Sequence, residues 1–129
     1  MPPDVTPDPK SRTLDRPRTR YRRKVASRKQ WEAIIAAKGA PCRICGQAGN
    51  GRVESKITFH HVVARVHGGD DCEDNIVPVC MFDHDKLTRR DPGIGLILLL
   101  TLTDAEYAYM VQRGGELYAE RAYGVTYAR

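Results

Sequence analysis

The chain has 129 residues and a formal net charge of +5, which is enough length for one modest hydrophobic core. Its longest apolar run, residues 94–100, is about a third of the roughly 20 residues that a transmembrane helix needs. The proline-rich start "MPPDVTPDPK" lacks the apolar segment of a secretory signal. The sequence therefore argues against membrane and secreted classes, and we expect a cytoplasmic protein.

Positive charge is concentrated in the N-terminal part of the sequence. Residues 10–29 contain ten Lys or Arg and one acid, whereas residues 30–129 contain eleven basic and thirteen acidic residues. Such a basic arm is typical of a nucleic-acid contact, because arginines neutralise phosphates and release counterions. A solubilising disordered tail is the alternative. The side chains expected to contact DNA are Arg16, Arg18, Arg20, Arg22, Arg23 and Lys24.

Helix and strand signals follow the basic arm. Ser27 is a suitable N-cap for a helix over residues 28–38, which Gly39 ends. Residues 52–64 are rich in β-branched side chains and predict a strand or the arm of a hairpin. The apolar run 76–80 predicts a second short strand, and its proline favours an edge or a strand end.

Helices dominate the remainder of the predicted structure. A helix is expected from Asp83 to about Arg90, where Asp91-Pro92-Gly93 ends it. Thr103 and Glu106 form a capping box for a further helix, and a last helix follows the Gly114-Gly115 break. Four side chains at helical spacing predict packing contacts rather than a base-stacking platform, either within this domain or on a second subunit: Tyr107, Met110, Leu117 and Tyr118.

An ordered set of polar residues spans the two predicted strands and the next helix: His60, His61, Asn75 and His84. The pattern is His-His on the first strand, Gly-Gly in the loop, Asn before the second strand, and Cys and His at the helix start. Through these residues, "FHHVVARVHGGDDCEDNIVPVCMFDHDK" resembles the HNH endonuclease family over about residues 42–88. The resemblance implies an α+β fold with a ββα-metal core, a zinc knuckle and flanking N- and C-terminal helices.

The resemblance also implies how these residues would hydrolyse a phosphodiester bond. His61 matches the general base, because a histidine can take a proton from water near neutral pH. His60 and His84 match the ligands of one divalent cation, and Asn75 is expected to brace the loop and orient His61 by hydrogen bonding. Adjacent strand residues point to opposite sides, so His60 and His61 need either a bulge or positions at different edges of one cleft.

The metal at this position is not fixed by the sequence. Two imidazole ligands favour Mn²⁺, Ni²⁺ or Zn²⁺, and Mg²⁺ is compatible through waters and phosphate oxygens. Arg65 and His67 flank the glycine loop. They are either phosphate contacts or solvated loop residues.

The cysteines predict a second, structural metal site. In HNH relatives with two CxxC pairs, a zinc ion joins the knuckle to the start of the helix, and Cys42, Cys45 and Cys80 match three of those four ligands. The fourth is either Asp83, at the position of the missing cysteine, or Cys72 from the loop. Zinc accepts a carboxylate ligand. Absence of zinc is the third alternative.

Three regions and one leading function follow from these patterns. We expect a basic arm over residues 1–26, an HNH nuclease domain over 27–92, and a C-terminal helical extension over 93–129. The leading function is a metal-dependent DNA endonuclease that makes single- or double-strand cuts. The tail resembles HNH proteins of actinobacterial viruses and mobile elements, which implies phage origin and genome packaging beside terminase. The alternatives are a non-catalytic, zinc-stabilised DNA-binding module and an accessory subunit of a packaging or recombination complex.

Overall fold

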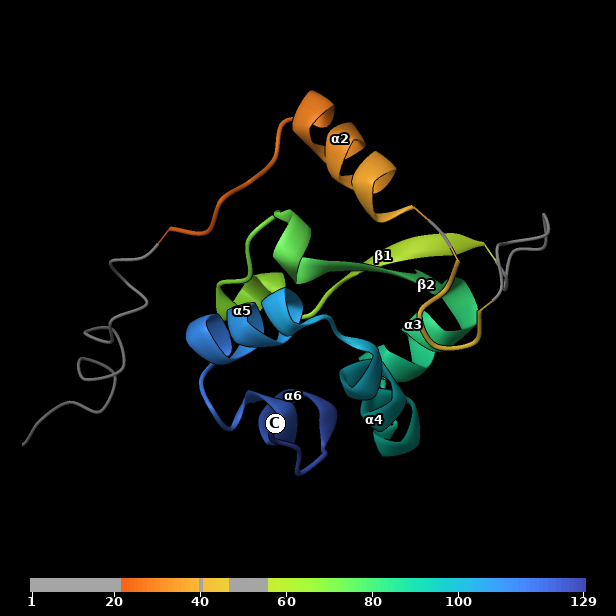
Figure 1. Cartoon of the computed structure of the whole chain (residues 1–129), viewed down its shortest axis with the longest axis vertical. Helices are drawn as coiled ribbons and strands as arrows, with labels where there is room; N and C mark the ends of the chain where they lie inside the picture. The colour runs from red at the N-terminus through yellow and green to blue at the C-terminus, as the bar shows by residue number, and fades with distance from the viewer. Residues whose placement is uncertain (1–21, 40, 47–55) are drawn as a thin grey trace, which may run out of the picture.

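The computed structural model describes residues 22–39, 41–46 and 56–129 (Figure 1). Helices and two short strands follow one another along the chain, with η denoting 3-10 helices: α2 (Arg28–Lys38), β1 (Ile57–His61), η3 (Arg65–His67), η4 (Glu73–Asn75), β2 (Ile76–Cys80), α3 (Met81–Thr88), α4 (Pro92–Thr101), α5 (Asp104–Gly114) and α6 (Tyr118–Tyr123). This mixture of helices and one small sheet is compatible with the α+β fold that the sequence predicts.

The two strands form an antiparallel pair that leads directly into α3. Phe59 lies opposite Pro78, and His61 lies opposite Ile76. Every residue of β2 is buried, whereas every residue of β1 is half-buried. The paired histidines of β1 are therefore half-buried and can reach solvent, whereas the apolar strand β2 beside them is buried.

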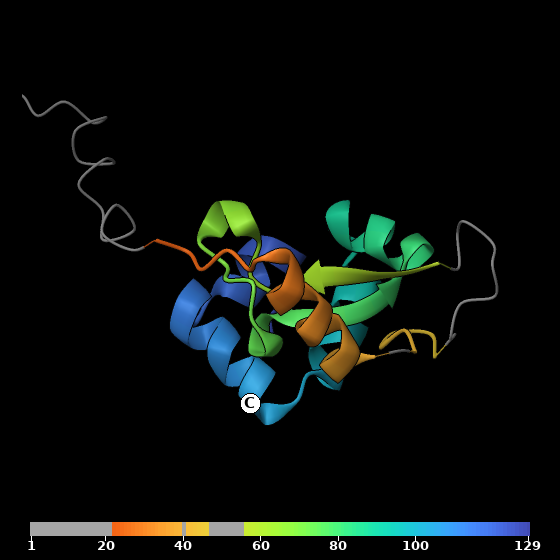
Figure 2. The same ribbon diagram turned by 90° about the horizontal axis from the view of Figure 1, so that it is seen from above.

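Helices cover both sides of this sheet. In Figure 1, α2 lies on one side of the two strands, and α3 and α4 lie on the other. The view from above in Figure 2 agrees, since α2 crosses in front of the strands. Helix α5 packs against η4, and α6 packs against α4. The C-terminal helices thus contact the ββα unit within the same chain.

Local capping explains where several helices begin. Ser27 accepts a hydrogen bond from the Gln30 amide, and the Gln30 side chain bonds back to Ser27. Thr103 and Glu106 form the same reciprocal capping box at α5. Both predicted caps are confirmed. These side chains satisfy backbone N–H groups that a helix start otherwise leaves unpaired.

Helix α4 is a difference from the sequence-based expectation. Asp91-Pro92-Gly93 was expected to interrupt helical structure, and it does end α3, but it also begins α4. The Asp91 carboxylate accepts from the amides of Gly93 and Ile94, and Pro92 occupies the first turn, where its missing N–H costs no hydrogen bond. None of the helices in the described part of the chain has the length and apolarity needed to cross a membrane.

One hydrophobic core joins the ββα unit to the C-terminal helices. Its fully buried side chains include Val77 and Val79 of β2 and Leu98 and Leu99 of α4. Tyr118 and Met110 are also buried, as predicted, and Tyr107 packs against the core. The prediction for Leu117 is wrong, because this side chain is 63% exposed. It lies at the start of the short helix α6, before the face that packs inward.

A buried carboxylate ties three elements together. Glu106 of α5 accepts two hydrogen bonds from Arg43, at 2.8 and 2.9 Å. It also forms an ion pair with Lys38 at the end of α2. Burial acts to raise the Glu106 pKa, but the bonds from Arg43 and Lys38 outweigh it and hold the pKa at about 2. Arg43, which lies between Cys42 and Cys45, is thereby anchored on α5.

Replacing Glu106 with glutamine is expected to lower the free energy of unfolding by about 3 kcal/mol at pH 7, since two partly buried cations lose their counter-charge. The Glu106 pKa is lowered from 4.5 to about 2, so its contribution is complete above pH 4.5 and is lost as the pH falls toward 2. Urea unfolding of wild type and variant at several pH values measures this difference. Glu116→Gln, at an exposed position, is the control, and an equal effect of both substitutions would contradict the account.

Candidate functional site

Three cysteines and one aspartate converge where the CxxC segment meets the start of α3. The ligand atoms of Cys42, Cys45, Cys80 and Asp83 all lie within 4.8 Å of one another. The Asp83 Oδ2 atom is 3.4 Å from the Cys42 sulfur and 3.2 Å from the Cys80 sulfur. This set could hold a metal ion. Cys72 lies apart from it, as the N-cap of η4.

Backbone geometry prepares these sulfurs for a cation. The Ile44 amide points at the Cys42 sulfur, and the Asp83 amide points at the Cys80 sulfur, each at 3.4 Å. Burial raises the pKa of the Cys80 thiol to about 12, so a bound cation would have to displace its proton. Three thiolates and a carboxylate in one closed group fit the chemistry of a structural zinc site.

The Gly-Gly pair lets the loop after β1 turn tightly against the chain. Gly68 ends η3 with a φ of 89°, a left-handed conformation that suits glycine. A Cβ atom on Gly69 would lie 1.7 Å from the Val63 carbonyl oxygen, so no larger residue fits there. The loop can therefore return and place Asp70 and Asp71 beside the end of β1.

Asn75 holds this loop from the inside. Its side chain is completely buried and accepts a hydrogen bond from the Val63 amide at 2.7 Å. Its Nδ2 atom donates to the carbonyl oxygens of Val63 and Asp70. The expected bracing of the loop is seen in these contacts. The direct partner of His61, however, is Asp71 rather than Asn75.

Replacing Asn75 with alanine should lower the free energy of unfolding by roughly 3 kcal/mol, because buried backbone groups of Val63 and Asp70 lose their partner. Chemical denaturation provides the measurement. Asp74→Ala, at an exposed neighbouring position of η4, is the control and should have little effect. Equal stability of Asn75→Ala and wild type would show that the loop does not depend on this amide.

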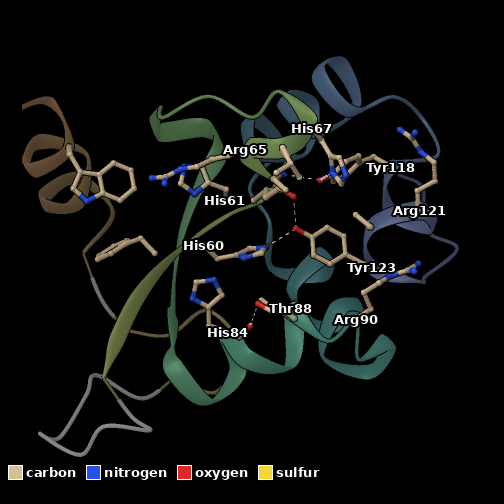
Figure 3. Close-up of a pocket in the computed structure, with 17 residues that line it drawn as sticks. His60, His61, Arg65, His67, His84, Thr88, Arg90, Tyr118, Arg121 and Tyr123 are labelled. Atoms are coloured by element: carbon tan, nitrogen blue, oxygen red, sulfur yellow. Dashed lines mark hydrogen bonds between the residues drawn. The ribbon is translucent and has the colours of Figure 1, made fainter. Parts of the chain in front are cut away.

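His60, His61 and His84 line one cleft of about 590 Å³ beside the sheet (Figure 3). Figure 3 shows the His60 ring facing His84 and Tyr123, while the His61 ring lies toward Arg65. The strand pairing is continuous through both residues, so no bulge is involved. The two adjacent histidines therefore occupy different edges of the same cleft, the second of the two expected arrangements.

Tyr123 of α6 fixes the protonation pattern of His60. The Tyr123 hydroxyl donates its one proton to the Val62 carbonyl oxygen and lies 2.8 Å from His60 Nε2. Since that proton is already used, Nε2 must carry a hydrogen and donate it to the tyrosine oxygen. Burial, followed by the neighbouring His84 and His61, lowers the pKa of His60 to about 3. The ring is neutral, with a free lone pair on Nδ1.

Thr58 fixes His84 in the same way. Its hydroxyl donates to the Val79 carbonyl oxygen at 2.9 Å and lies 2.8 Å from His84 Nδ1. His84 must therefore donate from Nδ1, which leaves the lone pair on Nε2. Burial also lowers the pKa of His84. His60 and His84, with ring centroids 5.2 Å apart, each offer one lone pair for a metal ion.

Asp71 fixes His61, and the N-terminal segment holds Asp71. His61 Nε2 lies 2.8 Å from Asp71 Oδ1, and Arg23 and the Ala26 amide also bond this carboxylate. Burial acts to raise the Asp71 pKa, but the bonds from His61 and Ala26 and the Arg23 charge bring it below its usual value. Asp71 is thus ionised and lies 2.8 Å from His61 Nε2, closer than the Arg65 Nε atom at 3.4 Å, so Nε2 donates to Asp71 and the lone pair is on Nδ1. The Trp31 ring stacks on the His61 ring, with 5.8 Å between the two ring centroids.

The basic residues of the arm differ in their surroundings. Arg22 and Lys24 have exposed side chains, which leaves them accessible to a phosphate backbone. The Arg23 guanidinium instead bonds Asp71 and the Gly69 carbonyl oxygen. The backbone of Lys24 also bonds the loop, through Asp70 and Asp71. The predicted contacts Arg16, Arg18 and Arg20 lie outside the described residues.

Comparison with known proteins finds a family match for part of the chain. The family model for HNH endonucleases matches residues 42–90, which is less than half of the chain and includes the cysteine group and the three cleft histidines. Neither the curated proteins nor the solved structures contain a match to the chain. Similarity to HNH endonucleases suggests a nuclease or nucleic-acid-binding role for the matched segment, and such nucleases use divalent metals and act on DNA.

Several residues of the site were not predicted from the sequence: Trp31, Thr58, Asp71 and Tyr123. Two of them, Trp31 and Tyr123, lie outside the segment that the family model matches. Asp71 comes shortly after the Gly-Gly pair. An acidic residue at this point of the loop was the sequence signal that could have indicated a partner for His61. Tyr123 carries no comparable signal, because its contact with His60 spans 63 positions of the sequence.

Proposed function

We propose that this protein is a metal-dependent DNA endonuclease that hydrolyses phosphodiester bonds. The observation that carries the proposal is the cleft arrangement within a segment similar to HNH endonucleases. His61 offers a free Nδ1 at one edge, and His60 and His84 offer one lone pair each at the other. A proton acceptor and a pair of metal ligands therefore face one space large enough for a phosphate group.

His61 acts as the general base. Its Nδ1 atom takes the proton of the attacking water, and the resulting positive charge is stabilised through Nε2 by the Asp71 carboxylate 2.8 Å away. Burial lowers the pKa of His61 although Asp71 opposes this shift, so the ring is neutral and able to accept a proton at pH 7. Trp31 and Asp71 restrict the ring to this orientation.

The donor set supports a divalent ion at His60 and His84. When bound, such an ion offsets charge at the phosphate and at the leaving 3′ oxygen. Two neutral imidazoles suit Mn²⁺, Ni²⁺ or Zn²⁺, and Mg²⁺ is compatible if waters and phosphate oxygens complete the shell. The proposed structural zinc site is separate and consists of Cys42, Cys45, Cys80 and Asp83.

The basic arm supplies affinity for the DNA backbone in this proposal. Arg22 and Lys24 are exposed on either side of Arg23 in the sequence, and Arg16, Arg18 and Arg20 precede them. Contacts with phosphates position a protein without reading the base sequence. Arg23 has a different role, because it holds Asp71.

The rival function is a zinc-stabilised DNA-binding module without catalysis. A fluorescent DNA duplex is titrated with zinc-loaded protein in buffer with Mn²⁺ and in buffer without it. Anisotropy measures binding and electrophoresis measures cleavage, which separates the two functions. We expect binding in both buffers and cleavage in Mn²⁺ alone, with ligatable 5′-phosphate and 3′-hydroxyl ends. Binding without cleavage in both buffers would favour the rival.

The resemblance to viral HNH proteins extends the proposal to a biological setting. We place the protein in the host cytoplasm, encoded by a phage or mobile element and acting in genome packaging beside terminase. Co-purification with terminase tests this setting. Cleavage that appears only in the mixture would favour the accessory-subunit alternative.

A further inference from the structure

Tyr123 lies on α6, outside the segment similar to HNH endonucleases, with a side chain that is 3% exposed. We propose that Tyr123 is a positioning residue for the catalytic metal ion, because its hydroxyl forces His60 to present Nδ1, rather than Nε2, as the ligand atom. This inference rests on the proposed function. In this proposal, the C-terminal helix α6 contributes a residue that orients a ligand of the catalytic metal ion.

The inference follows from counting protons among three groups. The Val62 carbonyl oxygen can only accept, so the Tyr123 hydroxyl must supply the proton in their hydrogen bond. The tyrosine oxygen is then an acceptor for the remaining contact, 2.8 Å from His60 Nε2. Only the His60 tautomer with hydrogen on Nε2 satisfies both contacts.

His84 carries the complementary arrangement. Thr58 donates to the Val79 carbonyl oxygen and so accepts from His84 Nδ1. The ion would therefore bind Nδ1 of His60 and Nε2 of His84, whose rings are nearly perpendicular, at 84°. Hydrogen bonds that orient a ligating histidine through its other nitrogen typically change metal affinity by about 10- to 100-fold.

A purely structural role for Tyr123 is the competing explanation, and α6 offers a matched control. Tyr118 is also buried on α6, its ring lies 6.2 Å from that of Tyr123, and its hydroxyl also bonds the backbone, at Ala64. Its histidine partner is His67 rather than His60. Replacing either tyrosine with phenylalanine keeps the ring and removes one buried hydroxyl.

The experiment compares Mn²⁺ affinity by calorimetry in wild type, Tyr123→Phe and Tyr118→Phe, each loaded with one equivalent of zinc for the cysteine group. Thiolates prefer zinc to manganese, so Mn²⁺ reports on the histidine site. We expect Kd to rise about 10- to 100-fold in Tyr123→Phe and to stay near the wild-type value in Tyr118→Phe. Equal Kd values in all three proteins, or an equal rise in both variants, would overturn the inference.

Nitrogen-15 NMR of wild type, with zinc in the cysteine group and no metal added for the histidine cleft, adds a test that needs no variant and no second metal. The inference requires hydrogen on Nε2 of His60, and hydrogen on Nδ1 would overturn it even if Tyr123→Phe failed to fold. Failure of the proposed function looks different: wild type would then neither cleave DNA nor bind Mn²⁺ more tightly than His60→Ala. Wild type that cleaves DNA but shows the wrong His60 tautomer would remove only the role of Tyr123.

Discussion

Replacing His61 with alanine is expected to reduce the single-turnover rate of DNA cleavage by about 10²- to 10⁴-fold, the usual contribution of a general base. Among His60, His61 and His84, the variant loses the one whose free nitrogen is not assigned to metal. Its side chain lies at the end of β1 and bonds Asp71 and no buried backbone group that is described, so DNA affinity and folding should be retained. Rapid-quench cleavage and anisotropy measure the two properties separately.

His67→Ala is the matched control for this prediction. His67 lines the same cleft but is exposed on η3, and its partner is Tyr118. Cleavage should fall only slightly in this variant. A similar loss in both variants would indicate that the substitutions disturb the loop, and an unchanged rate in His61→Ala would remove His61 from the mechanism.

Replacing Cys80 with serine is expected to release the structural zinc and to lower the free energy of unfolding by at least 3 kcal/mol. Zinc binding contributes directly to folding in small domains, where apparent binding free energies reach about 10 to 16 kcal/mol. Cys80 is also the junction of β2 and α3, and its sulfur caps the helix. Metal content by mass spectrometry and chemical denaturation provide the two measurements.

Two further substitutions identify the fourth ligand. Cys72→Ser should retain one zinc ion per chain, because Cys72 lies outside the cysteine group, whereas Asp83→Ala should lose or weaken zinc binding. Asp83 is 4% exposed and contacts two of the three sulfurs. Zinc content that is unchanged in Asp83→Ala but reduced in Cys72→Ser would assign the site to the loop cysteine instead.

Local signals in the sequence predict much of the ββα unit. β1 lies within the β-branched run 52–64, the apolar run 76–80 coincides with β2, and the Ser27 and Thr103 caps begin α2 and α5. These features depend on neighbouring residues, which a sequence displays directly. The start of α3 is two residues earlier than expected, because the Cys80 sulfur rather than a later polar side chain serves as its cap.

Features that depend on distant parts of the chain could not be predicted in this way. Pro92 was interpreted only as a helix breaker, although Asp91 before it allows it to begin α4. Asp71 bonds both His61 and Arg23, residues 10 and 48 positions away, and only the folded loop brings them together. The histidine tautomers likewise follow from hydroxyl groups whose partners the sequence does not reveal.

The central claim is that the histidine cleft hydrolyses DNA with the help of a divalent ion. The most direct measurement is electrophoresis of supercoiled plasmid after incubation with pure, zinc-loaded wild type or His61→Ala, each in buffer with Mn²⁺ and in buffer without it. The account predicts relaxed or linear plasmid only for wild type in Mn²⁺. Supercoiled plasmid that stays intact in every lane, although the protein binds it, would contradict the account, and so would equal cleavage by His61→Ala.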